Sequence, residues 1–336
     1  MRKEPTEILH DKILILDGAM GTSIQSLNLQ EADFRGLRFA NHPIQLKGNN
    51  DLLNLTNPEV IKEIHRSYID AGADIISTNT FNSNAYSQKE YGTDDLVAEL
   101  NFRGAQLARE VADACKERTI WVAGSMGPTS KTLSLSPEVN RPEFRDADFD
   151  TLAATYKVQA ENLIRGGADI LLLETCFDAL NTKAALFAIQ QLNEEGLPSA
   201  GTASPIPVMV SITINDKTGR TFTGQTMNAF YHSIAHYPIL SFGINCSFGV
   251  TELQPFVEQL ANELPCPISL HPNAGLPNET GEYGQSPDFM AQHMLRIAEK
   301  GYLNIAGGCC GTTPAHIRAL TEALRGIPPH RCHGFR

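Results

Sequence analysis

Three cysteines are the residues of this 336-residue sequence whose types and positions most clearly indicate chemistry. Cys309 and Cys310 are adjacent and follow two glycines at the end of a short apolar run, and Cys246 ends another apolar run. A bond between adjacent cysteines closes a strained ring, whereas two soft ligands at one strand end suit a thiophilic metal such as zinc. Three thiolates leave one zinc position open, which is typical of a catalytic site rather than a structural one. We therefore predict a zinc centre with Cys246, Cys309 and Cys310 as its ligands.

The scaffold that must bring these cysteines together is visible as eight apolar runs of strand length, each followed by a stretch with helical spacing. Strands that are apolar at nearly every position are buried on both faces, and strands that alternate with helices pair in parallel. Eight such units predict a single (β/α)8 TIM barrel with the zinc site at the C-terminal mouth of the strands. We expect the barrel to span 1–326 and residues 327–336 to form a tail or linker. The predicted strands are 12–17, 73–79, 119–125, 168–174, 206–213, 239–245, 266–271 and 302–306, and the predicted helices are about 58–71, 93–116, 148–166, 178–193, 225–236, 251–263, 286–300 and 314–325.

The ends of the predicted strands place two kinds of ligand on opposite sides of the mouth. Asp17 and Glu174 end the first and fourth strands, whereas the cysteines follow the sixth and eighth. This arrangement fits a zwitterionic amino acid that carries a thiol, with its sulfur on the metal and its ammonium group toward the carboxylates. Two unusually long connections, before Pro58 and after the third strand, leave from the same ends, and we expect both to wall the pocket.

Each of these residues has a simpler interpretation. Asp17 could merely cap the turn after the first strand, and His271 is more consistent with a packed residue than with a ligand. Glu174 is harder to explain structurally, because it ends an apolar run and a buried carboxylate without a partner is costly. The two glycines before Cys309 could mark a phosphate site, but two cysteines follow them and the first Lys or Arg after them is Arg318, which argues against it.

Composition excludes several classes of partner. The chain has 38 acidic and 27 basic residues, a formal net charge of -11, and no basic run. Nucleic acid and anionic membranes are therefore not expected as partners. No stretch approaches the ~20 apolar residues of a membrane span, and the N-terminus has no signal-peptide pattern. Seven irregularly spaced cysteines do not form a disulfide framework, so we expect a cytoplasmic protein.

Several segments resemble one known family. They are 16–22 (LDGAMGT), 46–51 (LKGNND), 72–81 (GADIISTNTF), the pair Glu174-Thr175, 243–246 (GINC) and 307–311 (GGCCG). On these segments the chain is similar to the homocysteine S-methyltransferases, and within them to the N-terminal homocysteine-binding modules of cobalamin-dependent methionine synthases. The resemblance covers nearly the whole chain. It implies a zinc-bearing (β/α)8 barrel that binds homocysteine and presents its sulfur to a methyl donor.

The resemblance also implies roles for individual residues. Cys246, Cys309 and Cys310 would bind zinc, and Asp17 with Glu174 would bind the homocysteine ammonium group. The main chain at Gly18 and Ala19, with Ser125, would be near the homocysteine carboxylate, and Asn79 is a further candidate contact. We add the hypothesis that the amide oxygen of Asn273 fills the open zinc position before homocysteine arrives.

The methyl donor is the least constrained part of this interpretation. Complete cobalamin-dependent synthases continue into folate-binding, cobalamin-bearing and reactivation modules, and these do not fit within 336 residues. We therefore expect methylcobalamin on another domain or chain as the donor. The alternative is a stand-alone enzyme that uses S-methylmethionine or a betaine-like donor. A site for a quaternary ammonium group is usually lined by aromatic side chains, and the single tryptophan, Trp121, is far from the mouth.

Two other classes of protein compete with this interpretation. A non-catalytic interaction module with a closed structural zinc would need a fourth protein ligand. A phosphate-binding lyase barrel would need a catalytic lysine at a strand end, and none is found there.

Overall fold

The structure, a computed structural model, describes residues 5–196, 205–279 and 281–332. Its strands are all parallel and form one sheet in the order β1-β8-β7-β6-β5-β4-β3-β2. The edge strands meet through a bridge between Leu16 and Ile75, so the sheet closes. The predicted (β/α)8 TIM barrel is confirmed. The strands are β1 (Leu14–Ile15), β2 (Ile75–Ser77), β3 (Trp121–Met126), β4 (Ile170–Cys176), β5 (Val208–Ile212), β6 (Ser241–Gly249), β7 (Ile268–Asn273) and β8 (Ile305–Ala306).

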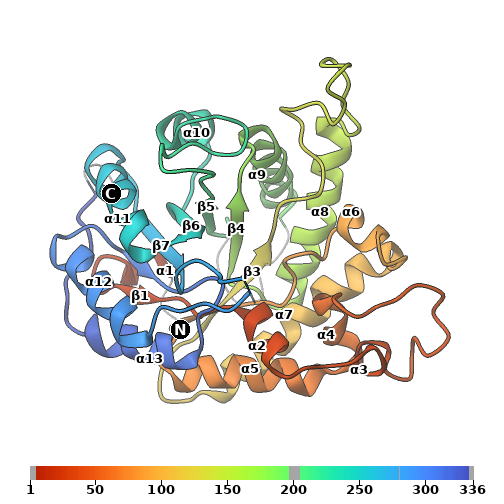
Figure 1. Ribbon diagram of the computed structural model, residues 1–336, viewed down its shortest axis with the longest axis horizontal. Helices are drawn as coiled ribbons and strands as arrows, with labels where there is room; N and C mark the ends of the chain where they lie inside the picture. The colour runs from red at the N-terminus through yellow and green to blue at the C-terminus, as the bar shows by residue number, and fades with distance from the viewer. Residues whose placement is uncertain (1–4, 197–204, 280, 333–336) are drawn as a thin grey trace.

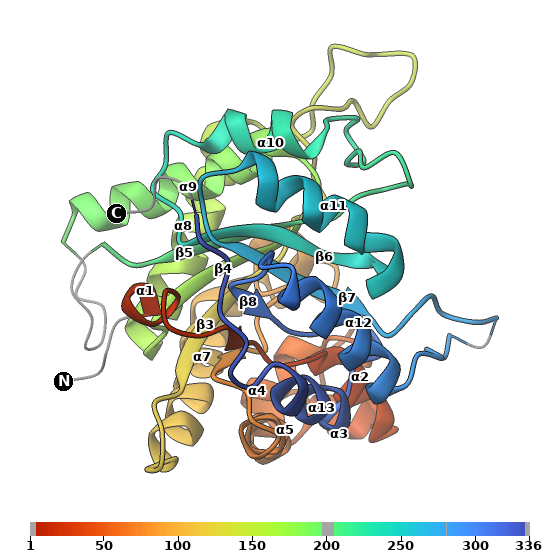
Figure 2. The ribbon, with the colours of Figure 1, turned by 90° about the vertical axis from the view of Figure 1, so that its left-hand side faces the viewer.

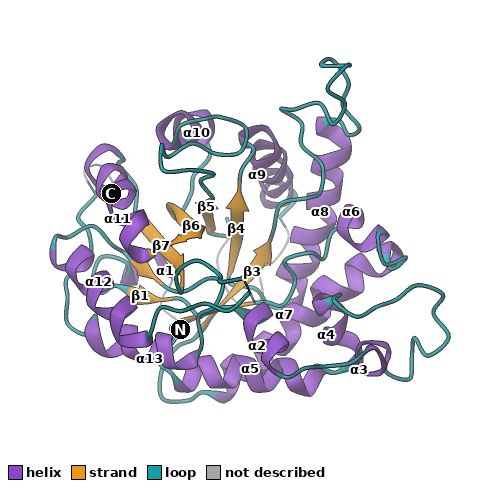
Figure 3. Cartoon of the chain, in the orientation of Figure 1, coloured by secondary structure: helices purple, strands orange, loops and turns teal. Residues whose placement is uncertain are grey.

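Helices surround the ring of strands, as Figures 1 and 3 show. Every predicted helix is present, with ends that differ from the prediction by a few residues. Proline occupies the first position of three of these helices, where its missing N–H would have no partner anyway. The surrounding helices are α5 (Pro58–Asp70), α7 (Val97–Ala114), α8 (Phe149–Gly166), α9 (Ala179–Glu194), α10 (Met227–Ile234), α11 (Val250–Glu263), α12 (Pro287–Glu299) and α13 (Pro314–Ala323).

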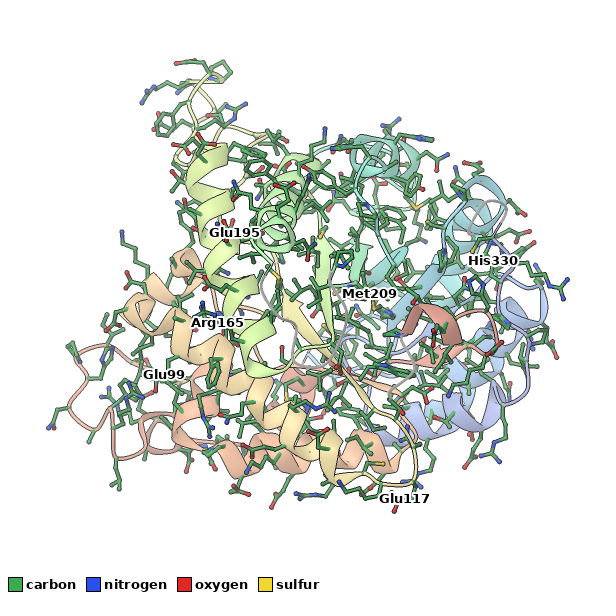
Figure 4. The ribbon with its side chains drawn as sticks, turned by 180° about the vertical axis from the view of Figure 1, so that it is seen from behind. Glu99, Glu117, Arg165, Glu195, Met209 and His330 are labelled. Carbon is green, nitrogen blue, oxygen red and sulfur yellow. The ribbon has the colours of Figure 1, made fainter. Side chains whose placement is uncertain are left out.

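Two apolar cores stabilise the barrel. Trp121, Leu172 and Met209 fill its interior, together with Leu9, which follows the short helix α1 (Pro5–Ile8) at the base. Figure 4, seen from behind, shows Met209 among the strands. The larger core lies between the strands and the surrounding helices. Because side chains fill the lower part of the barrel, ligands are confined to the mouth.

The two Gly-Ala-Asp segments of the sequence have the same role at the base of the barrel. Asp74 and Asp169 precede β2 and β4, and each accepts a backbone N–H from the preceding strand, at 3.0 and 2.8 Å. Each also pairs with a cation: Lys12 Nζ lies 2.7 Å from Asp74 and an Arg109 guanidinium nitrogen lies 2.7 Å from Asp169. The glycine of each segment ends the preceding helix with φ of 109° or 107°, a left-handed conformation that favours glycine.

The long connection after β1 covers the mouth. Within it, the Glu31 carboxylate accepts the backbone N–H groups of Leu46 and Lys47 and holds the loop together. Figure 2 shows α1 and α2 at opposite ends of the barrel. The short helices of this region were not predicted from the sequence. They are α2 (Met20–Ser26), α3 (Glu31–Arg35), η1 (Asn50–Leu52) and α4 (Leu53–Thr56), with α6 (Ala85–Lys89) after β2. The turn η2 (Asp94–Leu96) falls at the start of the predicted helix 93–116.

The long connection between β3 and α8 projects away from the barrel (Figure 1, yellow-green). Asp178, the N-cap of α9, accepts the Ser134 N–H at 3.0 Å and the Ser134 hydroxyl at 2.6 Å. These bonds anchor the connection over α9. None of residues 127–147 lines the large cavity at the mouth, so the expectation that this connection walls the pocket is wrong.

The described part of the expected tail packs against the base of the barrel. The His330 N–H donates to the Leu303 carbonyl at 2.8 Å, and Asn304 Nδ2 donates to the His330 carbonyl at 3.0 Å. The boundary at residue 326 stays a prediction. Across the described residues, every helix is too short or too polar to cross a membrane.

Candidate active site

The three predicted zinc ligands lie together at the mouth. The sulfur atoms of Cys246, Cys309 and Cys310 all lie within 4.8 Å of one another, and those of Cys246 and Cys310 are 3.8 Å apart. Tetrahedral zinc with Zn–S bonds of about 2.3 Å separates its sulfur ligands by ~3.8 Å. The cluster therefore fits zinc with little movement. Within the described residues, no other group of three or more such ligands is as close together.

Cys246 reaches this position through a bulge in β6. The register between β6 and β7 shifts between Asn245 and Gly249, and Cys246 and Ser247 have φ of 63° and 62°. Non-glycine residues rarely adopt this left-handed conformation, and a bulge re-aims the side chains that it carries. The strained backbone turns the end of β6 toward the other cysteines.

Cys309 and Cys310 depend on the glycines before them. A side chain at Gly308 would place its Cβ 2.4 Å from the Thr312 hydroxyl, so only glycine fits. The Cys309 N–H donates to the Pro272 carbonyl at 2.8 Å, and the Thr312 hydroxyl returns a bond to the Cys309 carbonyl at 2.7 Å. These contacts fix the backbone of both cysteines against the end of β7.

Hydrogen bonds among the three cysteines shift their pKa values in opposite directions. The thiols of Cys309 and Cys310 hydrogen-bond to Cys246, which lowers the pKa of Cys246 to about 3. The same interaction raises the pKa of Cys309 and Cys310. A divalent cation would allow all three sulfurs to ionise together. The donor set and its spacing therefore suit zinc.

The two predicted carboxylates face the cluster across the mouth. Asp17 is buried and accepts the Ser77 N–H and hydroxyl, both at 2.8 Å. Glu174 is half-buried and accepts the Ser125 hydroxyl. Burial raises the pKa of Asp17 to about 8 and that of Glu174 to about 7, and Glu174 also raises the pKa of Asp17. Within the described residues, no cation pairs with either carboxylate.

Glu174 is also placed by a bulge. The register between β4 and β5 shifts between Leu173 and Cys176, and Thr175 has φ of 58°. The Thr175 N–H therefore leaves the strand ladder, and it donates instead to Asn245 Oδ1 at 2.9 Å. Both functional ends of the site thus lie on bulged strands.

One cavity of about 680 Å³ joins these groups. Its outer wall comes from α2 and the segment that leads to η1, including Gln25, Phe34 and Asp51. The volume is within the range of small-molecule sites. The structure brings nine predicted site residues together in its lining: Asp17, Gly18, Ala19, Asn79, Ser125, Glu174, Cys246, Cys309 and Cys310.

Three of the predicted substrate contacts already have protein partners. The Ala19 N–H donates to the Thr312 hydroxyl at 3.2 Å, and the Ser125 hydroxyl donates to Glu174. Asn79 donates to the Asn50 carbonyl at 2.8 Å, which ties β2 to the loop over the mouth. Their contact with substrate stays a prediction.

Asn273 ends β7, between the two cysteine-bearing strands. It is buried, and its side chain hydrogen-bonds to Cys246. Its Oδ1 has no hydrogen-bond partner within the described residues, which is unusual for a buried polar atom. His271, on the same strand, is buried, and Nε2 is likewise unpaired there. Burial lowers the pKa of His271 to about 4, so the ring is neutral.

Several residues of the site were not predicted from the sequence. Asp51 lines the cavity and accepts the Asn82 N–H and the Ser83 hydroxyl, and burial raises its pKa to about 7. Asp51 lies in the 46–51 segment, which combines polar residues with apolar ones, and this mixed pattern was the only sequence signal that could have indicated a role at the site. Tyr283 also lines the cavity, and only the fold shows its proximity to the cysteines. Asn245, which precedes Cys246 in the sequence, lines the cavity too.

A second cavity, of about 550 Å³, opens beside Cys246. Phe177, Phe222 and Phe248 line it, and we call it the aromatic pocket. The rings of Phe177 and Phe222 meet edge to face, with centroids 6.0 Å apart. Cys246 lines both cavities, so the cluster is accessible from two sides.

Comparisons with known proteins agree with this geometry. The model of a family described as homocysteine S-methyltransferase matches residues 14–324. The homocysteine methyltransferase MmuM from Escherichia coli, in its oxidized form, has a similar structure, with a TM-score of 0.73 at 23% identity over 95% of this chain and 99% of that chain. Its metallated form gives 0.72 at 24% identity over the same shares, and its apo form gives 0.67 at 23% over 95% and 100%. At these identities the structural likeness supports the barrel fold.

Proposed function

The chain belongs to the homocysteine S-methyltransferase family and is a methyltransferase; from this premise we propose that it binds homocysteine through zinc and presents it for methylation to methionine. One observation carries the proposal. Three sulfurs within 4.8 Å of one another face two carboxylates, Asp17 and Glu174, across one cavity. A thiol-bearing amino acid is complementary to both ends. Cys246, Cys309 and Cys310 would hold the zinc.

The chemistry needs a nucleophilic sulfur. A free thiol with a pKa near ~8.5 is mostly protonated at neutral pH, and bound zinc would supply the substrate sulfur as a thiolate. The cysteine bulge and the glycines fix the geometry of the cluster before substrate arrives. No side chain needs to form a covalent bond with the substrate.

Asp17 and Glu174 would bind the homocysteine ammonium group. Burial raises the pKa values of both carboxylates, and an ammonium group would favour their ionised forms. Ser77 and Ser125 hold their oxygens toward the cavity. Gly18 and Ala19, with Ser125, line the same cavity and are the proposed surroundings of the homocysteine carboxylate, and Asn79 is a further proposed contact.

We also propose that Asn273 Oδ1 occupies the fourth zinc position until homocysteine replaces it. Its unpaired oxygen and its contact with Cys246 support this role. A substrate-free, zinc-loaded crystal structure would test it. Asn273 Oδ1 at about 2.1 Å from the metal is the expected result, and a water in that position would remove the idea.

Methylcobalamin is the proposed methyl donor, and its methyl group would derive from 5-methyltetrahydrofolate. Cobalamin-bearing and folate-binding domains or proteins, in the cytoplasm, would be the partners of this chain. The mouth cavity is larger than homocysteine requires, which leaves the sulfur accessible to a donor from outside. The resemblance of the motifs supports this choice.

The aromatic pocket favours a second candidate, a small S-methylmethionine or betaine-like donor. Aromatic faces attract onium cations, and Phe177 and Phe222 lie beside Cys246, where Trp121 does not reach. This pocket was not visible in the sequence, because Phe177 and Phe222 follow β4 and β5 whereas Phe248 lies in β6.

Turnover by the zinc-loaded chain distinguishes the two donors. The chain would be mixed with homocysteine and with methylcobalamin, S-methylmethionine or betaine, and methionine would be quantified, with Cys309→Ser as the inactive control. Methionine formation from methylcobalamin alone is the expected result. Turnover with an onium donor would establish the second candidate, and no methionine from any donor would contradict both.

A further inference from the structure

We infer that Asn245 is a positioning residue that couples the two ends of the active site. Its side chain contacts Cys309 in the sulfur cluster and Thr175, which follows Glu174. The inference rests on the proposed function, since it assigns Asn245 to the support of the same zinc and ammonium sites. Asn245 is buried, with 1% of its surface exposed.

The hydrogen bonds fix the orientation of the Asn245 amide. Oδ1 accepts the Thr175 N–H at 2.9 Å and the Ser211 hydroxyl at 2.7 Å. A backbone N–H can only donate, so the oxygen must lie on this side. Nδ2 must then face the Thr175 hydroxyl, at 2.9 Å, and the Cys309 sulfur, at 3.8 Å. The Thr175 N–H therefore determines which way the Asn245 amide is flipped, and this flip directs Nδ2 at Cys309.

The N–H group of Asn245 Nδ2 acts on the metal side of the site. The hydrogen bond from Asn245 Nδ2 limits the rotation of the Cys309 side chain and so holds its sulfur in the cluster. Groups that hydrogen-bond to metal ligands typically change metal affinity by 10–100-fold when removed. Asn245 precedes Cys246 in the sequence, so one segment supplies a ligand and the support for another ligand 64 residues away.

The Oδ1 atom of Asn245 acts on the substrate side of the site. Thr175 is β-branched and has φ of 58°, a conformation that needs external support. At the bulge its N–H has no strand partner and uses Asn245 Oδ1 instead. Loss of this bond would release the bulge that positions Glu174, and the ammonium site would lose its geometry.

Two substitutions separate these roles. Asn245→Asp keeps the oxygen that accepts the Thr175 N–H but replaces the donor to Cys309 with a second oxygen. Asn245→Leu removes both functions without adding charge, and it covers the case in which Asn245→Asp does not fold. Asn304→Asp is a matched control at the base of the barrel. Asn304 is equally buried, its Oδ1 accepts the Ile268 N–H at 2.9 Å, and its Nδ2 donates to the His330 carbonyl.

The primary measurement is the dissociation constant of Zn2+, by competition with a chromophoric chelator. Asn245→Asp and Asn245→Leu should weaken Zn2+ binding by about 10–100-fold, and Asn304→Asp should stay close to wild type. Equal Zn2+ affinity in wild type and both Asn245 variants would overturn the metal side of the inference. A wild-type chain that binds no Zn2+ at one equivalent would instead contradict the proposed function.

The second measurement is the KM for homocysteine at saturating Zn2+. Asn245→Leu should raise this KM by more than Asn245→Asp does, because only the former leaves the Thr175 N–H unpaired. A general structural defect would lower the melting temperature without separating the two variants. The same KM in both would overturn the role in holding Glu174.

Discussion

Carboxylates at the two ends of this barrel have opposite surroundings. At the base, Asp74 and Asp169 accept backbone N–H groups and lie 2.7 Å from Lys12 and Arg109. At the mouth, Asp17 accepts two hydrogen bonds from Ser77, but within the described residues it has no cation. The Ser125 hydroxyl donates to Glu174, and the Asn82 N–H and the Ser83 hydroxyl donate to Asp51.

The difference indicates which carboxylates stabilise the fold and which serve a ligand. The charges at the base are compensated within the protein, so they contribute to stability. The charges at the mouth are not, and burial raises the pKa of Asp17 to about 8 and of Glu174 to about 7. We propose that a cation from outside, the ammonium group of an amino acid, would complete the mouth as Arg109 completes the base.

The largest expected effect is at the base. Arg109→Met leaves Asp169 buried without its cation and should lower the free energy of unfolding by about 3 kcal/mol. The KM for homocysteine of the protein that remains folded should not change. Chemical denaturation measures the free energy of unfolding, and steady-state kinetics measures the KM.

The matched control is Arg165→Met. Arg165 lies on the outside of α8 (Figure 4), where its ion pair with Glu161 is exposed, and its loss should cost about 0.5 kcal/mol or less. Equal destabilisation by the two substitutions would contradict the assignment of Asp169 as a stabilising carboxylate.

The second effect is at the mouth. Asp17→Asn removes one partner of the substrate ammonium group and should raise the KM for homocysteine by about 100-fold. It should also stabilise the substrate-free protein at pH 8 by about 1 kcal/mol, because an uncompensated carboxylate is removed. Asp74→Asn should do the reverse, with lower stability and an unchanged KM. Loss of stability in Asp17→Asn would mean that Asp17 is structural.

The third effect is the pH dependence of stability. The folded pKa of Asp17 lies near 8, above its ordinary value of 3.8, so the folded protein holds a proton that the unfolded chain has released. The resulting stabilisation is complete below about pH 4 and is lost as pH rises through about 8. Between pH 5 and pH 8 the free energy of unfolding should fall because of this group, since only the folded protein still holds the proton. Denaturation curves at several pH values should show a smaller loss in Asp17→Asn, and an identical pH dependence would contradict the raised pKa.

The smallest effect is at Lys12. Its side chain is 50% exposed, and Asp74 keeps Arg118 at 3.6 Å, so Lys12→Met should cost only about 0.5 kcal/mol. The substitution tests whether the base depends on buried pairs such as Arg109 and Asp169 or on charge alone. A loss of stability in Lys12→Met as large as that in Arg109→Met would indicate that the base depends on charge alone. Thermal unfolding with both variants side by side is sufficient.

The sequence predicted the barrel well because the information is local. Each strand is an apolar run, and most of the surrounding helices begin with a capping side chain or a proline, so no long-range contact was needed to count eight units. The ends of parallel strands converge by geometry, which placed Asp17, Glu174 and the three cysteines at one mouth. The short helices over the mouth were missed, because segments of five to seven residues carry little periodicity.

The remaining parts of the site depend on contacts between distant segments. Asn245 contacts Thr175 and Cys309, which lie 70 and 64 residues away, and no pattern around Asn245 indicates this. The bulges in β4 and β6 follow from register between strands, which a single strand does not encode. The connection after β3 was misplaced for the same reason, since Asp178 on another element anchors it.

Zinc-edge X-ray absorption with and without homocysteine tests the central claim most directly, on wild type and on Cys309→Ser. We predict three sulfur neighbours and one light atom in the substrate-free protein, and four sulfurs once homocysteine is bound. Cys309→Ser should lose one sulfur in both states. A coordination shell that homocysteine does not change would mean that the zinc is structural, and the proposed methyl acceptor site would be contradicted while the barrel remained.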